Sequence, residues 1–129
     1  MNPDFARAIV LKVAFKPEPL RRAQAALLYV AMTGQSFTAD CLPGEIVAGD
    51  TKLPGLAVGT LARIGLIQSL GFTRSPSLTR HGSWVQRWRL ADGKDSTAKT
   101  WLKRNGFDAT VPAERQLDLL AAPTPFPRN

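Results

Sequence analysis

The chain has 129 residues, of which 44% are hydrophobic, and a formal net charge of +7. This length suits one domain with short appendages, and this hydrophobic content is enough for a folded core, so the composition argues against a disordered chain. The longest uncharged apolar run, Ala25 to Met32, is far shorter than the roughly 20 residues that a membrane-spanning helix requires. We therefore expect a globular protein that makes no membrane contact.

The cysteine content and the N-terminal residues bear on the cellular compartment. Cys41 is the only cysteine and cannot form an intrachain disulfide, which is typical of proteins in a reducing cytosol. The first residues carry charges at Asp4, Arg7 and Lys12 and lack a small-residue cleavage site, so we expect no signal peptide. Both features predict a cytoplasmic protein.

The positive charge is concentrated in the segment from Arg63 to Arg104. This segment holds nine basic residues and only two acidic ones, whereas the eight bases and eight acids of the remaining chain cancel. A local positive field of this kind attracts polyanions. The charge distribution therefore favours a nucleic acid as the partner, and the alternative is a solvated basic surface that keeps the protein soluble.

The first half of the chain has the spacing of helices. Residues 5–15 carry apolar side chains at helical spacing and favour a helix over a strand. Residues 20–34 predict a second helix, because they are rich in alanine and end in glycine. Residues 36–55 hold three glycines and two prolines, so we expect only a loop and a short helix capped by Thr38 or Ser36.

The next segment predicts a third helix that starts at Pro54 and stops at Gly65. Its expected apolar face is formed by Ala57, Leu61 and Ile64.

Two strands are expected after this helix, at residues 66–74 and 83–90, with a loop at 75–82. Trp84 and Trp88 share one face of the second strand, whereas Arg87 and Arg89 lie on the other. We expect the tryptophan face to pack on the helices and the arginines to point outward. The alternative for the tryptophans is stacking on nucleic acid bases.

The chain ends with a short helix and a tail. The helix is expected to be capped by Asp95 or Ser96 and to stop at Gly106. We divide the chain into four parts, which are an N-terminal extension (1–19), a central domain (20–91), a basic C-terminal helix (92–108) and an amphipathic, Pro-rich tail (109–129).

The order helix, short helix, helix, strand, loop and strand in residues 20–90 resembles a winged helix-turn-helix domain. The segment is similar to small winged-helix proteins of bacteriophages and prophages. These share Gly-Leu-Ile at the end of the third helix, a basic glycine-containing wing and a Trp near the end of the last strand, which here are 65–67, 80–82 and Trp88. The resemblance implies an α+β fold with a three-helix core and a two-stranded β-hairpin wing, flanked by short helices.

The resemblance also implies a DNA-binding surface in three parts. Basic wing residues would contact phosphates or the minor groove, the third helix would approach the major groove, and the last helix would extend the basic surface. If four to six wing side chains neutralise phosphates, log affinity should fall against log salt with a slope of roughly −4 to −5. The predicted DNA-binding residues are Lys52, Thr60, Arg63, Arg74, Arg80, His81, Arg87, Arg89, Lys99, Lys103 and Arg104.

The third helix offers few groups that read bases. Between residues 53 and 63 it contains no Asn or Gln for a bidentate base contact. Either the protein binds DNA mainly through the backbone and the wing, or the exposed face of this helix packs on another protein.

Motifs for catalysis are not found in the sequence. It contains no P-loop and no Gly-x-Gly-x-x-Gly motif, and Cys41 has no Cys or His at metal-ligand spacing. The acids are scattered, and the single histidine, His81, sits among arginines. We therefore predict a protein without catalytic activity, metal or cofactor.

A short motif follows in the tail. Residues 116–120, Gln-Leu-Asp-Leu-Leu, resemble the peptide Gln-Leu-Ser/Asp-Leu-Phe by which bacterial proteins dock on the DNA polymerase sliding clamp. Leu120 replaces the usual Phe, which should weaken the anchor. The resemblance implies contacts from Gln116, Leu117, Leu119 and Leu120, and the alternative is an amphipathic helix that covers the core with the same leucines.

These observations predict a non-catalytic protein that binds double-stranded DNA. Its expected role is transcription regulation or an accessory step of DNA replication in a phage or mobile element. The alternative is a winged-helix adaptor that binds a protein, with the sliding clamp as one candidate. A homodimer is left open.

Overall fold

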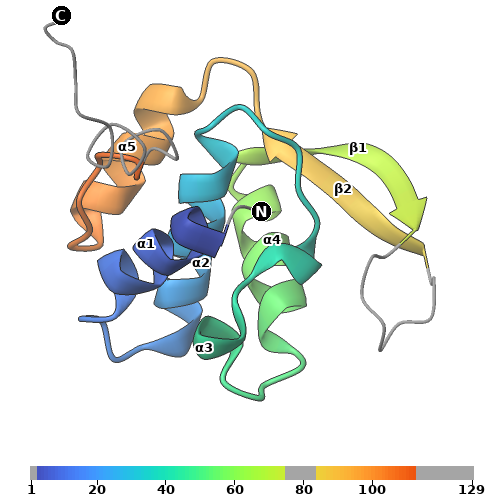
Figure 1. Ribbon diagram of the computed structural model, residues 1–129. Coiled ribbons are helices and arrows are strands. Elements are labelled where there is room, and N and C mark those ends of the chain that lie inside the picture. Colours follow the sequence, from blue (N-terminus) through green and yellow to red (C-terminus); the bar gives the residue numbers. More distant parts are fainter. Residues whose placement is uncertain (1–2, 75–83, 113–129) are drawn as a thin grey trace, which may run out of the picture.

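The computed structural model describes residues 3–74 and 84–112, and within them the chain forms five α-helices, one 3₁₀ helix and a two-stranded antiparallel sheet (Figure 1). This confirms the α+β class, and the arrangement is compatible with a winged helix. The elements in chain order are α1 (Pro3–Val13), α2 (Pro19–Ala31), η1 (Ala39–Cys41), α3 (Gly44–Val47), α4 (Leu53–Arg63), β1 (Ile67–Arg74), β2 (Trp84–Leu90) and α5 (Asp95–Arg104).

The central element is α2, in which every residue from Ala23 to Ala31 is buried. Pro19 lies in its first turn, where the fixed φ of proline suits the helix and its missing N–H costs nothing. The alanines of α2 let α1 and α4 approach it closely from different sides. None of the helices described is both long enough and apolar enough to cross a membrane.

The two flanking helices belong to the same core as α2. Phe5 and Ile9 of α1 are buried, which confirms a helix rather than a strand for the N-terminal residues. Ala98, Leu102 and Phe107, in and after α5, are buried in this core too. The segments flanking the expected central domain therefore share its hydrophobic interior.

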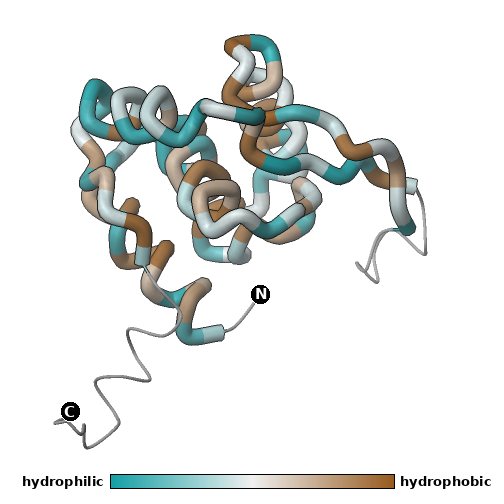
Figure 2. Tube along the Cα trace, turned by 90° about the horizontal axis from the view of Figure 1, so that it is seen from above, coloured by the Kyte–Doolittle hydropathy of each residue, from teal (hydrophilic) through white to brown (hydrophobic). Residues whose placement is uncertain are grey.

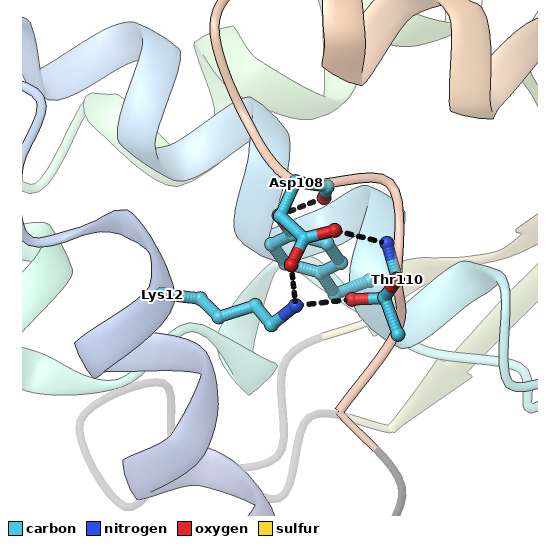
Figure 3. A network of polar contacts seen from close by, with 4 residues as sticks. Lys12, Asp108 and Thr110 are labelled. Carbon is cyan, nitrogen blue, oxygen red and sulfur yellow. Dashed lines mark hydrogen bonds and ion pairs between the residues drawn. The ribbon is translucent and has the colours of Figure 1, made fainter.

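A polar network ties the segment after α5 to the first two helices (Figure 3). Lys12 Nζ lies 2.9 Å from Asp108 Oδ2 and also donates to the carbonyl of Thr110. Tyr29 Oη donates to the carbonyl oxygen of Asp108 at 2.6 Å. The hydrogen bond from Lys12 lowers the pKa of Asp108 to about 2, so this carboxylate stays charged at neutral pH.

The capping residues agree only in part with the expectation. Thr38 caps η1, because its side chain accepts a hydrogen bond from the backbone N–H of Asp40. The prediction that Asp95 or Ser96 caps α5 is wrong, since Lys94 occupies the N-cap without a side-chain cap bond. Asp95 lies one position further, in the first turn, where it faces the positive end of the helix dipole and pairs with Lys99 at 3.3 Å.

The sheet pairs β1 with β2 from Ile67 opposite Leu90 to Arg74 opposite Trp84. A bulge interrupts this register between Ser69 and Gly71. Such a bulge increases the local twist of a hairpin, and Gly71 adopts a positive φ of 99° there. The predicted loop at 75–82 lies outside the described residues.

A third extended segment joins the base of the hairpin. Phe37, in the loop after α2, forms an antiparallel bridge with Trp88 of β2. The Phe37 N–H donates to the Trp88 carbonyl at 2.9 Å, and the Trp88 N–H donates to the Phe37 carbonyl at 2.8 Å. This pairing fixes the base of the hairpin against the helices, while its other end projects beyond them (Figure 1).

Candidate nucleic-acid interface

A tight turn places α4 after α3. Ala48 and Gly49 both have positive φ values, 52° and 80°, which end α3 in the left-handed region. The Lys52 N–H donates to Asp50 Oδ1 at 3.0 Å, and Pro54 lies in the first turn of α4. These features join α3 to α4 by a tight turn and leave one face of α4 exposed.

The exposed face of α4 is small and apolar between two basic ends. Gly55, Leu56 and Gly59 are exposed along it, and Arg63 is exposed in its last turn. Lys52 is exposed just before its first turn, about 16 Å away at the rise of an α-helix. Lys52 and Arg63 are therefore two separated positive charges at the two ends of α4.

Thr60 does not lie on this exposed face, contrary to our expectation that it approaches a DNA groove. Its hydroxyl accepts a hydrogen bond from Gln24 Nε2 at 2.7 Å and donates to the Ala57 carbonyl at 2.9 Å. Gln24 is only 4% exposed, and its Oε1 accepts from Arg21 at 3.1 Å. Thr60 thus satisfies a buried amide of α2, and its role is in packing.

Replacing Thr60 by Val should destabilise the fold. The variant keeps the shape of the side chain but leaves the buried Gln24 amide without its acceptor, which costs roughly 1–3 kcal/mol. Urea unfolding measures this loss, and Thr60→Ser, which keeps the hydroxyl, is the control. A Val variant as stable as the parent protein would contradict the assigned role.

The base of the hairpin is anchored as predicted, but its outer part is not. Trp88 is half-buried and packs against the core, whereas Trp84 is 63% exposed. Trp84 is four positions before Trp88 in β2, which places it about 13 Å further along the strand, toward the open end of the hairpin. The prediction that Trp84 packs in the core is therefore wrong.

The arginines of the hairpin lie on both of its faces. Arg74 is paired with Trp84 on the face toward α4, and its guanidinium carbon lies 5.0 Å from the centre of the Trp84 ring. Arg87 is exposed on the opposite face and donates a hydrogen bond to Ser36. Arg89 is half-buried and forms an ion pair with Asp92 at 2.8 Å, which neutralises much of its charge.

The basic residues of α5 do not join this surface. Lys103 and Arg104 are exposed in the last turn of α5, and Lys99 pairs with Asp95. Figure 1 shows α5 at the end of the molecule away from the projecting hairpin. The charge that is contiguous in sequence is therefore divided between two regions in space.

The predicted residues Arg80 and His81 lie outside the described residues, as do Gln116, Leu117, Leu119 and Leu120 of the tail.

A groove separates α4 from the hairpin. It has a volume of about 460 Å³. The strands of the hairpin carry both hydrophobic and hydrophilic residues (Figure 2). Phe72, which sequence reasoning missed, is 68% exposed here and is the diagonal neighbour of Trp84 on the same face. The sequence could have indicated this position, because Phe72 and Arg74 are two residues apart and therefore lie on the same face of a strand. The lining residues are Ala39, Gly55, Val58, Gly59, Phe72, Trp84, Val85, Gln86 and Trp88.

Reactive groups do not gather in the described residues. Burial raises the pKa of the Cys41 thiol to about 12, so the thiol is protonated at neutral pH and a poor nucleophile. Among residues 3–74 and 84–112, no three His, Cys, Asp or Glu side chains come together in a group that would hold a metal ion. The side chains of this face that could contact a ligand are therefore mainly charged and aromatic ones.

Comparison of the chain with protein-family models, with curated proteins and with solved structures found no match. The functional interpretation rests on the geometry of α4, the hairpin and the groove between them.

Proposed function

We propose that this chain is a winged helix-turn-helix protein that binds DNA through α4 and the β1–β2 hairpin. The order of elements supports this class, since α2, the helix-turn-helix of α3 and α4, and the hairpin follow one another. The isolated bridge between Phe37 and Trp88 joins the base of the hairpin to the loop after α2. In particular, the resemblance of residues 20–90 to phage and prophage proteins favours a regulator of transcription or an accessory factor of DNA replication.

The observation that carries the proposal is the placement of exposed arginines beside the helix-turn-helix. Arg63 lies at the end of α4, and Arg74 and Arg87 lie on opposite faces of the hairpin. Side chains on both faces of a projecting hairpin can reach phosphates on both sides of a DNA groove. Lys52 supplies a further positive charge at the start of α4.

This surface suits binding without strong sequence preference. Phosphate contacts provide affinity but carry no base information, and the exposed face of α4 holds glycines and a leucine in place of bidentate groups. No bond is made or broken in this function, and it needs no metal or cofactor. Lys99, Lys103 and Arg104 form a second basic region, which would contact only DNA that extends around the molecule.

A second candidate is a winged-helix adaptor that binds a protein. The observation that favours it is the exposure of two large apolar side chains at α4, Leu56 at 53% and Ile64 at 56%. The sliding-clamp motif at 116–120 lies outside the described residues and stays a prediction.

Amide chemical shifts of isotope-labelled protein, recorded with and without a random duplex at low salt, test the proposal. We expect the largest changes at Arg63, Arg74 and Arg87 and small changes along α5, because only the former flank the proposed contact surface. Unchanged spectra would overturn DNA binding. Changes at Leu56 and Ile64 that depend on protein concentration alone would show that this apolar surface binds a second copy of the chain.

A further inference from the structure

We propose that the groove between α4 and the hairpin holds an unpaired nucleobase stacked on Trp84 and Phe72, so that the protein prefers DNA with a single-stranded segment over intact duplex. This inference rests on the proposed DNA-binding function and names the form of DNA that the same surface recognises.

Two large aromatic side chains are exposed at one place on the hairpin. Single exposed apolar residues are common on protein surfaces, but large aromatic rings carry more apolar area than other side chains. Phe72 and Trp84 are 68% and 63% exposed, lie on the same face of adjacent strands, and border one groove. Their position as diagonal neighbours keeps them within reach of one shared ligand.

The wall of the groove opposite the hairpin is formed by α4. Gly55 and Gly59 of α4 line the groove, and a Cβ built at either glycine would meet no atom within 4 Å. The groove is therefore kept open by the absence of side chains on the helix. Its volume of about 460 Å³ falls in the range typical of small-molecule sites.

A positive charge lies at the groove. The guanidinium carbon of Arg74 lies 5.0 Å from the centre of the Trp84 ring, whereas Arg63 lines a different pocket with α2 and Trp101 of α5. A nucleotide supplies both a flat ring for the aromatic wall and a phosphate for the Arg74 guanidinium. An apolar peptide helix would match the aromatic wall but would offer no anionic group to the Arg74 guanidinium.

A paired base cannot take this place, because its ring is already stacked between its neighbours in the duplex. Removing it costs a few kcal/mol of unstacking and unpairing, a cost that is least for a base that is already single-stranded. The groove therefore selects for unpaired segments, while the arginines bind phosphates of either form.

The test is the affinity of the full chain for three labelled probes. These are an oligothymidine of about 16 nucleotides, a duplex of the same length, and a duplex with a central single-stranded gap. We expect the parent protein to bind the single strand and the gapped duplex at least about fivefold more tightly than the intact duplex. Trp84→Ala should weaken binding to the first two probes about tenfold and leave duplex affinity within about twofold.

Three further variants separate stacking from folding. Trp84→Phe keeps an aromatic ring and should retain most of the affinity. Gly59→Leu places a side chain in the groove, its Cβ would meet no atom within 4 Å, and it raises helix propensity, so it should abolish the preference for unpaired DNA in a folded protein. Leu70→Ala, at an exposed apolar residue that does not line the groove, should change nothing.

The outcomes separate this inference from the function on which it rests. Equal affinity of the parent protein for paired and unpaired probes would overturn the inference and leave DNA binding intact. Equal losses on all probes in Trp84→Ala would overturn it too, since Trp84 would then merely support the wing. Absence of binding to every probe would overturn the proposed function, and the inference with it.

Discussion

Replacing Arg63 and Arg87 together by glutamate should lower the affinity for duplex DNA about 100-fold at low salt. Each charge-assisted contact to a phosphate is worth at least about 1.4 kcal/mol, or tenfold in affinity, and each glutamate adds repulsion. The two residues are exposed on different elements, α4 and β2, so the double variant removes contacts from both parts of the surface. Fluorescence anisotropy of a labelled duplex measures the change.

The matched control is the double variant Lys103→Glu and Arg104→Glu, which changes the net charge by the same amount. These residues are exposed on α5, away from the projecting hairpin (Figure 1). Because the control leaves the charges of the hairpin and of α4 in place, we expect it to lose less than about threefold. Equal losses in the two double variants would show that overall charge, and not this surface, determines binding.

Replacing Ile9 by Ala should lower the free energy of unfolding by about 2–5 kcal/mol, the largest effect that we expect on stability. Ile9 is 0% exposed between the first two helices and the rest of the core, so its truncation leaves a cavity. Leu11 is 64% exposed on the same helix, and Leu11→Ala should change stability by no more than about 0.5 kcal/mol. Urea unfolding followed by circular dichroism measures both.

This pair of variants tests whether the N-terminal segment is part of the fold. Residues 1–19 were expected to be an extension of the domain, yet Phe5, Ile9 and Val13 are all buried in the common core. A small loss of stability in both variants would mean that α1 does not pack on α2 in solution.

The helices were largely predictable because their signals are local. The spacing of Phe5, Ile9 and Val13 indicates both the helix α1 and its buried face, and the structure confirms both. Ile64 was assigned to the apolar face of α4 by the same reasoning, but it is 56% exposed. The helix ends at Arg63 and the chain turns at Gly65, whose φ is 82°, so the helical period no longer applies at Ile64.

The orientation of the site residues was not predictable in the same way. Thr60 faces inward because Gln24, 36 positions earlier in the chain, requires an acceptor. Trp84 is exposed at the start of β2, whereas Trp88 of the same face is half-buried, and this difference depends on tertiary packing. Neither fact has a local signal in the sequence.

The spatial arrangement of the basic residues was also not predictable from the sequence. Basic residues between 63 and 104 are contiguous in the chain, but β2 leads away from the hairpin tip into α5. Arg87 therefore lies on the hairpin and Lys103 at the other end of the molecule (Figure 1). The sequence shows that the basic residues cluster in the chain, and the structure shows that they are distributed over separate elements.

The most direct test of DNA binding is the anisotropy of a labelled random duplex, titrated with the protein at several salt concentrations. If the wing and α4 neutralise several phosphates, log affinity falls linearly with log salt, with a slope of roughly −4 to −5. A slope in this range would establish a contact with multiple phosphates. No binding even at low salt would contradict the account and leave the exposed apolar residues of α4, Leu56 and Ile64, as the surface to investigate.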